Sequence, residues 1–215
     1  MTFLGKIHQA KKLIKEAIEK YPKIAVACSF GKDSMTLIHL CQQIKKDIPI
    51  FTVTSPFLPK ESLRYKDRMI QKYKMNIKEY TRKPGPVGLW KTDPDACCYY
   101  YKVEPTKEAV KDLDAWIAGL RKSEGSTREE CKYIEKRGNI IKINPILDFT
   151  ELDSWRYLAI NHIPPNPLYG KGYRSLDCKF CIRKEKDESE PERAGRWAGT
   201  SKCGGECGIH THVLK

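Results

Sequence analysis

The stretch KIAVACSFGKDSMTLIHLCQQIKK, residues 23–46, decides the fold class. Residues 23–29 form a short apolar run that predicts a buried strand, and residues 35–46 return to the period of an amphipathic helix. The tight polar loop between them brings backbone N–H groups to a helix start, which favours a bound anion. The alternative is an ordinary turn in which Asp33 caps the helix. We predict an anion site made by the loop residues Ser29, Phe30, Gly31, Lys32, Asp33 and Ser34.

The alternation of strands and helices continues along the chain. Further strands are predicted at residues 48–54, 76–82, 115–120 and 139–147, and helices at 5–21, 60–74 and 150–162. Thr150 is a candidate N-cap for the last helix. This order implies an α/β fold, a parallel twisted sheet with helices on both faces. Residues 184–215 are charged and end in a Gly-rich tail, so we expect an α/β domain at 1–183 and a mobile C-terminal extension at 184–215.

The composition of the 215 residues, 40% hydrophobic and 31% charged, indicates a soluble globular protein. No apolar run is long enough to span a membrane, so no membrane partner is expected. The N-terminal segment lacks the apolar region of a signal peptide, which favours a cytoplasmic location. The formal charge of +13 suits an anionic partner, although a Lys-rich solvated surface explains it equally well.

The chain holds nine cysteines, an odd number that argues against a disulfide framework in a protein without an export signal. Cys97 and Cys98 are adjacent, and Cys178 and Cys181 form a C-x-x-C pair. Four thiolates suit either zinc or an iron–sulfur cluster. The adjacent pair favours the cluster, because structural zinc sites space their ligands more widely. Alternatively, only the C-x-x-C pair binds a metal. Three further cysteines are predicted to be structural: Cys28, Cys41 and Cys131.

Several motifs together resemble one family. The loop SFGKDS is similar to the PP-loop of the adenine-nucleotide α-hydrolase superfamily. The stretches CCYYYK (97–102), WIAGLRKSEGSTR (116–128), RAGRWAG (193–199) and ECGIH (206–210) and the segment 144–181 resemble motifs of the phosphosulfate reductases, in the same order. The paired cysteines resemble the iron–sulfur class of adenylyl-sulfate (APS) reductases within that family.

The resemblance implies thioredoxin-dependent reduction of APS to sulfite and AMP in assimilatory sulfate reduction. In the family a tail cysteine, here Cys207, attacks the sulfur of APS, expels AMP and carries a thiosulfonate. Thioredoxin or a similar dithiol protein then releases sulfite. By position, His210 would orient or protonate groups near Cys207, and Lys102 would lie between the sulfate and a [4Fe-4S] cluster. The cluster ligands would be Cys97, Cys98, Cys178 and Cys181. Phosphate and sulfate oxygens would be bound by Arg121, Arg128, Arg193 and Arg196.

Two features depart from the family pattern. Val53 and Ser55 stand where the family has Asp and Gly, and Cys203 adds a second tail thiol that would resolve the thiosulfonate through a disulfide with Cys207. The close alternative is reduction of the 3′-phosphorylated nucleotide, PAPS. More distant alternatives are sulfur transfer to nucleic acid, in tRNA thiolation or DNA phosphorothioation, and a zinc-containing nucleic-acid-binding module. Under the leading interpretation a nucleic-acid partner is not expected. The sequence leaves open whether the chain forms a homo-oligomer.

Overall fold

A six-stranded sheet in the order β3-β2-β1-β4-β6-β5 forms the centre of the computed structural model, which describes residues 1–85, 88–187, 189–202 and 207–210. The strands are β1 (Ile24–Ala27), β2 (Ile50–Val53), β3 (Ile77–Tyr80), β4 (Ala115–Ile117), β5 (Ile134–Arg137) and β6 (Ile140–Ile143). All neighbouring pairs are parallel except β5 with β6. The prediction of a parallel α/β sheet is confirmed, with an antiparallel strand added at one edge.

The sequence did not predict β5. Its residues, IEKR, alternate between exposed and half-buried positions, so it lacks the buried apolar run of the central strands. The strand lies at the edge of the sheet and joins β6 through a short turn in which Gly138 has a φ of 58°. An edge strand that needs only one neighbour can be short and polar.

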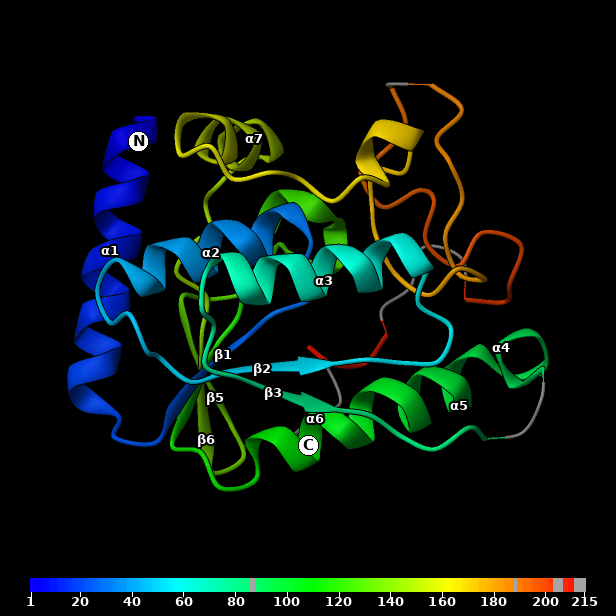
Figure 1. The fold of residues 1–215 in the computed structure, drawn as a ribbon, viewed down its shortest axis with the longest axis horizontal. Coiled ribbons are helices and arrows are strands. Elements are labelled where there is room, and N and C mark those ends of the chain that lie inside the picture. Colours follow the sequence, from blue (N-terminus) through cyan, green and yellow to red (C-terminus); the bar gives the residue numbers. More distant parts are fainter. Residues whose placement is uncertain (86–87, 188, 203–206, 211–215) are drawn as a thin grey trace.

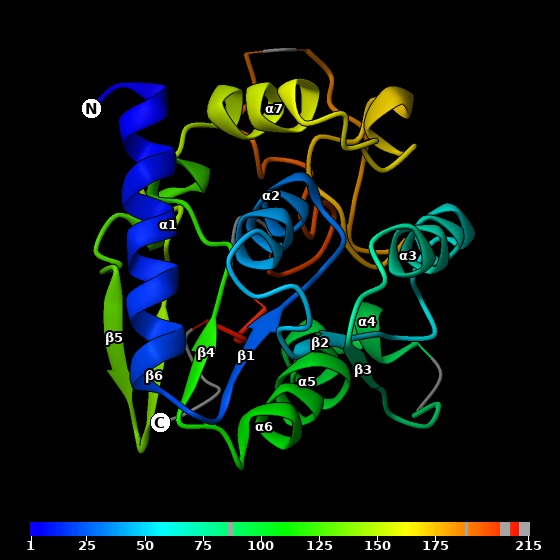
Figure 2. The same cartoon turned by 60° about the vertical axis from the view of Figure 1, so that its left-hand side comes forward.

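Helices cover both faces of the sheet, as predicted (Figures 1 and 2). One face carries α1 (Phe3–Lys20), α2 (Lys32–Gln42), α3 (Lys60–Lys72) and α7 (Glu151–Ile160). The opposite face carries α6 (Glu104–Val110). The alternation of buried strands with amphipathic helices therefore produces two hydrophobic cores, one on each side of the sheet.

Local sequence signals hold these elements in place. Thr150 accepts a hydrogen bond from the backbone N–H of Asp153 at 3.1 Å, and Asp153 accepts one from Thr150 N, which confirms the predicted N-cap of α7. Cys28 and Cys41 are buried in the larger core, as predicted. Burial raises the pKa of both thiols, to about 12 for Cys28, so they remain uncharged apolar groups.

Residues 89–110 form a run of short helices that the sequence did not predict. They are α4 (Leu89–Thr92), α5 (Pro94–Cys98), a π-helical turn (Tyr99–Val103) and α6. Prolines at 94 and 105 interrupt the run, so no single apolar period extends along it. The segment places the Cys97–Cys98 pair and Lys102 on consecutive turns. Short 3-10 turns occur elsewhere, at Lys122–Glu124, Ser126–Arg128 and Tyr169–Lys171.

The described part of the C-terminal extension packs against the domain. Ile182 and Arg196 form an antiparallel bridge, and the Trp197 side chain is completely buried. A Cβ atom on Gly195 would lie 2.7 Å from the carbonyl oxygen of Arg183, so only glycine permits this approach. The extension thus has a defined path over the cavity described below. Its movement during a reaction, and the domain boundary at residue 183, stay predictions.

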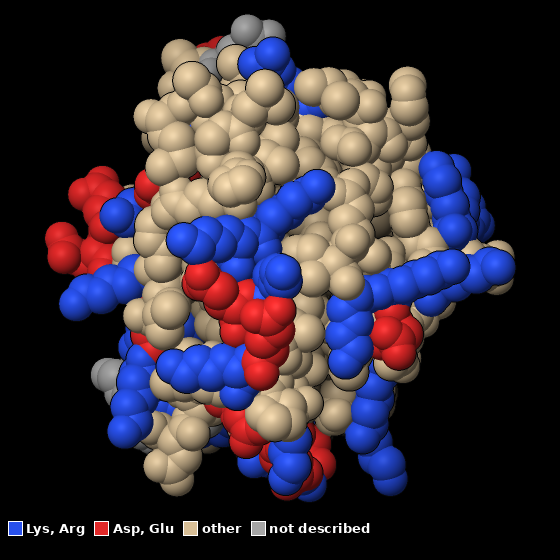
Figure 3. Space-filling model, turned by 90° about the vertical axis from the view of Figure 1, so that its left-hand side faces the viewer, with Lys and Arg blue, Asp and Glu red and all other residues tan. Residues whose placement is uncertain are grey.

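The basic charge is spread over the surface on the side of α1. Figure 3 shows Lys and Arg side chains interspersed with acidic ones and with uncharged surface on this face. Two pairs on α1, Lys12 with Glu16 and Lys15 with Glu19, are exposed partners one turn apart. No described helix is long and apolar enough to cross a bilayer.

Candidate active site

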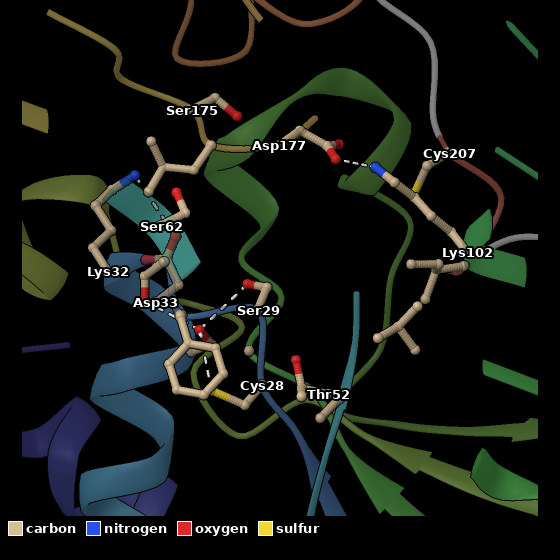
Figure 4. A pocket seen from close by; sticks show the side chains of 18 of the residues that line it. Cys28, Ser29, Lys32, Asp33, Thr52, Ser62, Lys102, Ser175, Asp177 and Cys207 are labelled. Carbon is tan, nitrogen blue, oxygen red and sulfur yellow. Dashed lines mark hydrogen bonds and ion pairs between the residues drawn. The ribbon is translucent and has the colours of Figure 1, made fainter. Parts of the chain in front are cut away.

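A cavity of about 250 Å³ opens at the carboxyl ends of the central strands. It lies where the strand order changes direction, between β1 and β4, the usual ligand position in an open α/β sheet. Figure 4 shows that Ser29, Lys32 and Asp33 line one end of the cavity, whereas Lys102, Asp177 and Cys207 line the other. We call these the loop end and the cysteine end.

The loop end is built by the turn from β1 into α2. Phe30 is buried with a φ of 57°, a left-handed conformation that is costly for a bulky residue and tightens this turn. Gly31 occupies the N-cap position, where a Cβ atom would lie 3.2 Å from the Tyr169 hydroxyl oxygen. That hydroxyl accepts the backbone N–H of Lys32 at 2.9 Å. Ser29 donates to Ser34 at 3.3 Å. The predicted anion-binding residues thus lie together, with a tyrosine hydroxyl against the loop.

Lys32 is buried, and its ammonium group contacts a carboxylate of the C-terminal extension. Its Nζ donates to Glu192 at 2.6 Å and lies 3.7 Å from Asp33 and 3.6 Å from Glu151. Burial acts to lower the pKa of Lys32, but Asp33, Tyr169 and Glu192 raise it above its ordinary value. The lysine therefore remains charged, and that charge is balanced within the protein.

Arg121 connects the same carboxylates from the other side. Its guanidinium is fully buried and donates to Asp33 at 2.7 Å and to Glu192, while its backbone N–H donates to Glu124 at 3.0 Å. Oxygens of these three carboxylates lie within 4.8 Å of one another. Because Arg121 contacts all three residues, it supplies the positive charge that such a cluster requires. Arg128 also pairs with Glu124.

The cysteine end holds a second network of charged side chains. Asp177 is buried, and its two carboxylate oxygens accept hydrogen bonds from Lys102 and from Arg196. Burial acts to lower the pKa of Lys102, but Asp177 and the thiols of Cys178 and Cys207 raise it above its ordinary value. Lys102 therefore stays positively charged beside Cys207, the position that Figure 4 shows.

Cys207 is 8% exposed and shares a buried cluster with Cys98, Cys178, Cys181 and Trp197. It also lines the same cavity as the loop residues, although it follows them by more than 170 positions in the chain. The structure thus brings the tail thiol, Lys102 and the nucleotide loop into one cavity. Cys203 and His212 lie outside the described residues.

The four predicted ligand cysteines surround a small second cavity next to Lys102. Cys97, Cys98, Cys178 and Cys181 are all buried, and the cavity between them is also lined by aromatic rings of Phe57, Trp90, Tyr101 and Phe180. Burial raises the pKa values of these thiols, to about 11 for Cys97 and Cys181 and to about 12 for Cys178. Without a bound cation they are therefore protonated at neutral pH.

Ser55, one of the two departures from the family pattern, lies against this group. Its hydroxyl oxygen is 3.0 Å from the Cys178 sulfur, and it also accepts the backbone N–H of Phe57 at 3.3 Å. Val53 ends β2 and lines the main cavity. The serine therefore contributes a hydroxyl to the cysteine group, which a glycine at the same position would not.

His210 lies beyond Cys207, with its ring 6.2 Å from the Trp116 ring and nearly parallel to it. Burial lowers the pKa of His210 well below its ordinary value, and the nearby charges of Lys142, Arg128, Arg193 and Arg137 lower it further. The imidazole is therefore neutral at physiological pH. Arg193 packs its guanidinium over the Trp197 ring at 5.8 Å and lines the main cavity.

Residues 23–184 match the family model described as the phosphoadenosine phosphosulfate reductase domain. The chain belongs to the phosphoadenosine phosphosulfate reductase family. The adenosine 5′-phosphosulfate reductase of Oceanobacillus iheyensis is 36% identical over 215 aligned residues, which cover 94% of this chain and 88% of that protein. Adenosine 5′-phosphosulfate reductase 2 of Bacillus subtilis is 35% identical, with 87% and 83% covered.

Among solved structures, the phosphoadenylyl-sulfate reductase of Candida auris in complex with phosphate aligns with a TM-score of 0.71 at 20% identity. The alignment covers 80% of this chain and 88% of that protein. At this identity the likeness concerns the fold, and it agrees with the predicted PP-loop architecture of the phosphosulfate reductase family.

Sequence reasoning missed the carboxylates that balance the site. Glu192 contacts Lys32 from 160 residues away, and Asp177 contacts Lys102 from 75 residues away. Glu192 lies outside the matched motifs, and Asp177 lies within the matched segment 144–181 but was assigned no role. Each directly precedes a predicted site residue, Arg193 or Cys178, and this adjacency was the only signal that the sequence offered.

Proposed function

We propose that this chain reduces adenosine 5′-phosphosulfate to sulfite and AMP, with Cys207 as the nucleophile. The observation that carries the proposal is that Cys207 lines the same cavity as the PP-loop and lies beside the charged Lys102. The names of the curated relatives support this substrate over its 3′-phosphorylated form. The reaction belongs to assimilatory sulfate reduction.

The thiolate of Cys207 attacks the sulfur atom of the sulfate group. A new S–S bond forms, the bond from sulfur to the phosphate oxygen breaks, and AMP leaves with that electron pair. Lys102 and Arg196 face the charge that develops on the sulfate oxygens, and Arg128 and Arg193, which line the same cavity, bind the phosphate. The neutral imidazole of His210 orients groups around Cys207 as a hydrogen-bonding partner rather than as a cation.

The resulting thiosulfonate on Cys207 needs a dithiol to complete the reaction. One thiolate of thioredoxin or a similar protein attacks the Cys207 sulfur and releases sulfite, and the second thiolate resolves the mixed disulfide. The dithiol is oxidised to a disulfide while the transferred sulfur gains two electrons. We also propose a cytoplasmic location, because a reducing compartment keeps a nucleophilic thiol such as that of Cys207 from forming a disulfide.

We further propose that Cys97, Cys98, Cys178 and Cys181 hold a [4Fe-4S] cluster. Trp197 supports this fit, because its indole Nε1 is buried next to three of these cysteines and has no hydrogen-bond partner among the described residues. Ligands of one zinc ion would lie about 3.8 Å apart, given a Zn–S bond of about 2.3 Å. Within the described chain, no three of these sulfurs gather within 4.8 Å of one another. A cluster spreads its ligands over several iron atoms and accommodates this spacing.

When bound, the cluster would supply the positive charge that keeps these four buried thiols deprotonated. The chain's own residues then act on the substrate. The turn that carries Cys98 also carries Lys102, and the turn that carries Cys178 also carries Asp177. Holding the two turns together fixes Lys102 and Asp177 at the cavity, and Asp177 in turn holds Arg196.

The test is a steady-state assay of the anaerobically purified protein with APS or PAPS, thioredoxin, thioredoxin reductase and NADPH. We expect stoichiometric sulfite and AMP from APS and at least about tenfold lower kcat/KM with PAPS. Higher activity with PAPS would transfer the proposal to that substrate. Absence of sulfite from both, in protein with a full complement of iron, would contradict the proposal and favour sulfur transfer to nucleic acid.

A further inference from the structure

Asp177 places a negative charge where an anionic substrate would be expected to find only positive ones. Its carboxylate lies in the wall of the main cavity, next to Ser175 and across from Cys207 (Figure 4). One oxygen accepts from Lys102 and the other from Arg196, and both cations line the same cavity as Cys207. An acid in this position weakens the attraction for a sulfate group, so its presence requires an explanation.

We propose that Asp177 is a positioning residue that sets how tightly the cysteine end binds anions, by holding Lys102 and Arg196 together and cancelling one of their two charges. The inference rests on the proposed function, since it concerns the APS sulfate group. Together, Lys102, Arg196 and Asp177 carry one net positive charge, which faces the substrate. That charge orients the sulfate, and it also lets the sulfonate on Cys207 leave the cavity to meet a dithiol.

The carboxylate is fixed rather than displaceable. Asp177 Oδ1 also accepts the backbone N–H of Cys178 at 2.8 Å, which ties the side chain to the turn that carries the C-x-x-C pair. The Asp177 side chain is 7% exposed, and Lys102 and Arg196 are 12% and 9% exposed. A buried acid with three donors around it stays in place when a substrate binds, so both cations keep one orientation.

The acid is the point at which the two cations meet. They approach Asp177 from separate segments, the π-helical turn Tyr99–Val103 and the C-terminal extension. Like charges brought together in a buried place repel, and an intervening carboxylate converts that repulsion into attraction. Arg196 is held further by its guanidinium, which packs 4.4 Å from the Trp197 ring centroid and donates to Leu176 O at 3.0 Å.

The experiment compares APS binding, by calorimetry, between a Cys207→Ser parent and the same protein carrying Asp177→Asn. Both are purified anaerobically, with iron content and melting temperature measured. The amide keeps the shape and removes the charge, so the Kd for APS is expected to fall about tenfold. The Kd for adenosine, which carries no charge, is expected to stay within twofold. In the protein that retains Cys207, Asp177→Asn is expected to lower both KM and kcat, because the anionic sulfonate on Cys207 would leave the cavity more slowly.

Two controls separate charge from structure. Asp177→Glu retains the charge and should leave the APS Kd within threefold of the parent, so a tenfold gain in that variant would overturn the proposal. Glu190→Gln removes a carboxylate of the same extension that pairs with Arg183, and it should leave both Kd values unchanged. If Asp177→Asn does not fold, a tenfold tighter APS Kd in Asp177→Glu would still overturn the proposal.

The outcomes also distinguish this inference from the proposed function. A parent that binds adenosine but not APS would contradict the proposed function itself. A parent that binds APS, with an Asp177→Asn variant that is folded, iron-loaded and no tighter for APS, would overturn only the role assigned to Asp177.

Discussion

The two ends of the cavity are both built from ion pairs of buried side chains, but they differ in their chemistry. At each end, a charged side chain of the C-terminal extension, Glu192 or Arg196, pairs with a charged side chain of the domain. Each end also contains a buried aromatic residue with positive φ, Phe30 at 57° and Trp197 at 51°. The loop end has Lys32, Arg121, Asp33 and Glu192, and the cysteine end has Lys102, Arg196 and Asp177.

The difference between the ends is the thiol. The ion pairs at the loop end are buried and mutually balanced, so they hold the loop in shape. The pairs at the cysteine end face Cys207 and can act on a reacting group. The comparison teaches that a phosphate loop that matches a family motif does not by itself locate the chemistry. The following changes should separate the two ends.

The largest effect is expected from Cys207→Ser. A hydroxyl is a far weaker nucleophile than a thiolate, so sulfite formation should fall by at least about 10⁴-fold. Binding of AMP, which depends on the loop end, should remain within threefold by calorimetry. Sulfite formation above a hundredth of the unmodified rate would contradict the assignment of the nucleophile.

A change at the loop end should instead affect stability. Arg121→Met leaves Asp33 and Glu192 buried with one cation fewer, which should destabilise the fold by about 3–5 kcal/mol in urea unfolding. The matched control is Arg137→Met, since Arg137 is 37% exposed and pairs with Glu135 near the surface. That variant should lose less than about 1 kcal/mol. Equal losses in both variants would show that the loop network is not structural.

Lys102→Gln should reduce kcat/KM by about 100-fold, because it removes a charge that faces the reacting sulfate. The control is Lys107→Gln, which changes a half-buried lysine of α6 whose ammonium group lies 3.5 Å from the Tyr99 hydroxyl, and it should retain full activity. Iron content is measured in both variants. A loss of activity that follows the loss of iron in Lys102→Gln would assign the lysine to the cysteine group rather than to the substrate.

The smallest effect concerns pH. Burial and neighbouring cations lower the pKa of His210, so the unfolded chain binds a proton more readily than the folded one. The contribution of His210 to the free energy of unfolding is therefore complete above the ordinary pKa of histidine. As the pH falls below that ordinary pKa, the contribution is lost by up to about 1.4 kcal/mol per pH unit. His210→Gln should flatten urea-unfolding stability between pH 7 and 5.

Asp33 provides the contrast at the loop end. Its burial acts to raise the pKa, but Lys32 and Arg121 lower it below the ordinary value. Its contribution to stability is therefore complete above that ordinary value and is lost only as the pH falls through the lowered pKa. A slope between pH 7 and 5 that His210→Gln leaves unchanged would contradict the account of the histidine.

The sequence was sufficient where structure is local. The strand, loop and helix at 23–46 and the N-cap Thr150 follow from short-range periodicity and capping, and the structure contains them. The helices at 89–110 escaped prediction because Pro94 and Pro105 divide the segment into helices too short to show an apolar period. The edge strand β5 escaped because none of its residues is buried, so its sequence lacks an apolar run.

The family motifs located the cations and thiols of the site but not their counter-charges. Glu192 and Asp177 reach their partners across 160 and 75 residues, and such pairings depend on the packing of the whole chain. The neutral state of His210 has the same origin, since burial, together with four cations from separate segments, lowers its pKa. Electrostatic balance of this kind is a property of the folded molecule.

The most direct test of the central claim is a single turnover without a dithiol. The anaerobic, iron-containing protein is incubated with sulfur-labelled APS, and the label is mapped by peptide mass. The account predicts one AMP released per chain and one labelled sulfonate on Cys207, discharged as sulfite when thioredoxin is added. Release of AMP with no label on Cys207, or label on another cysteine, would contradict it.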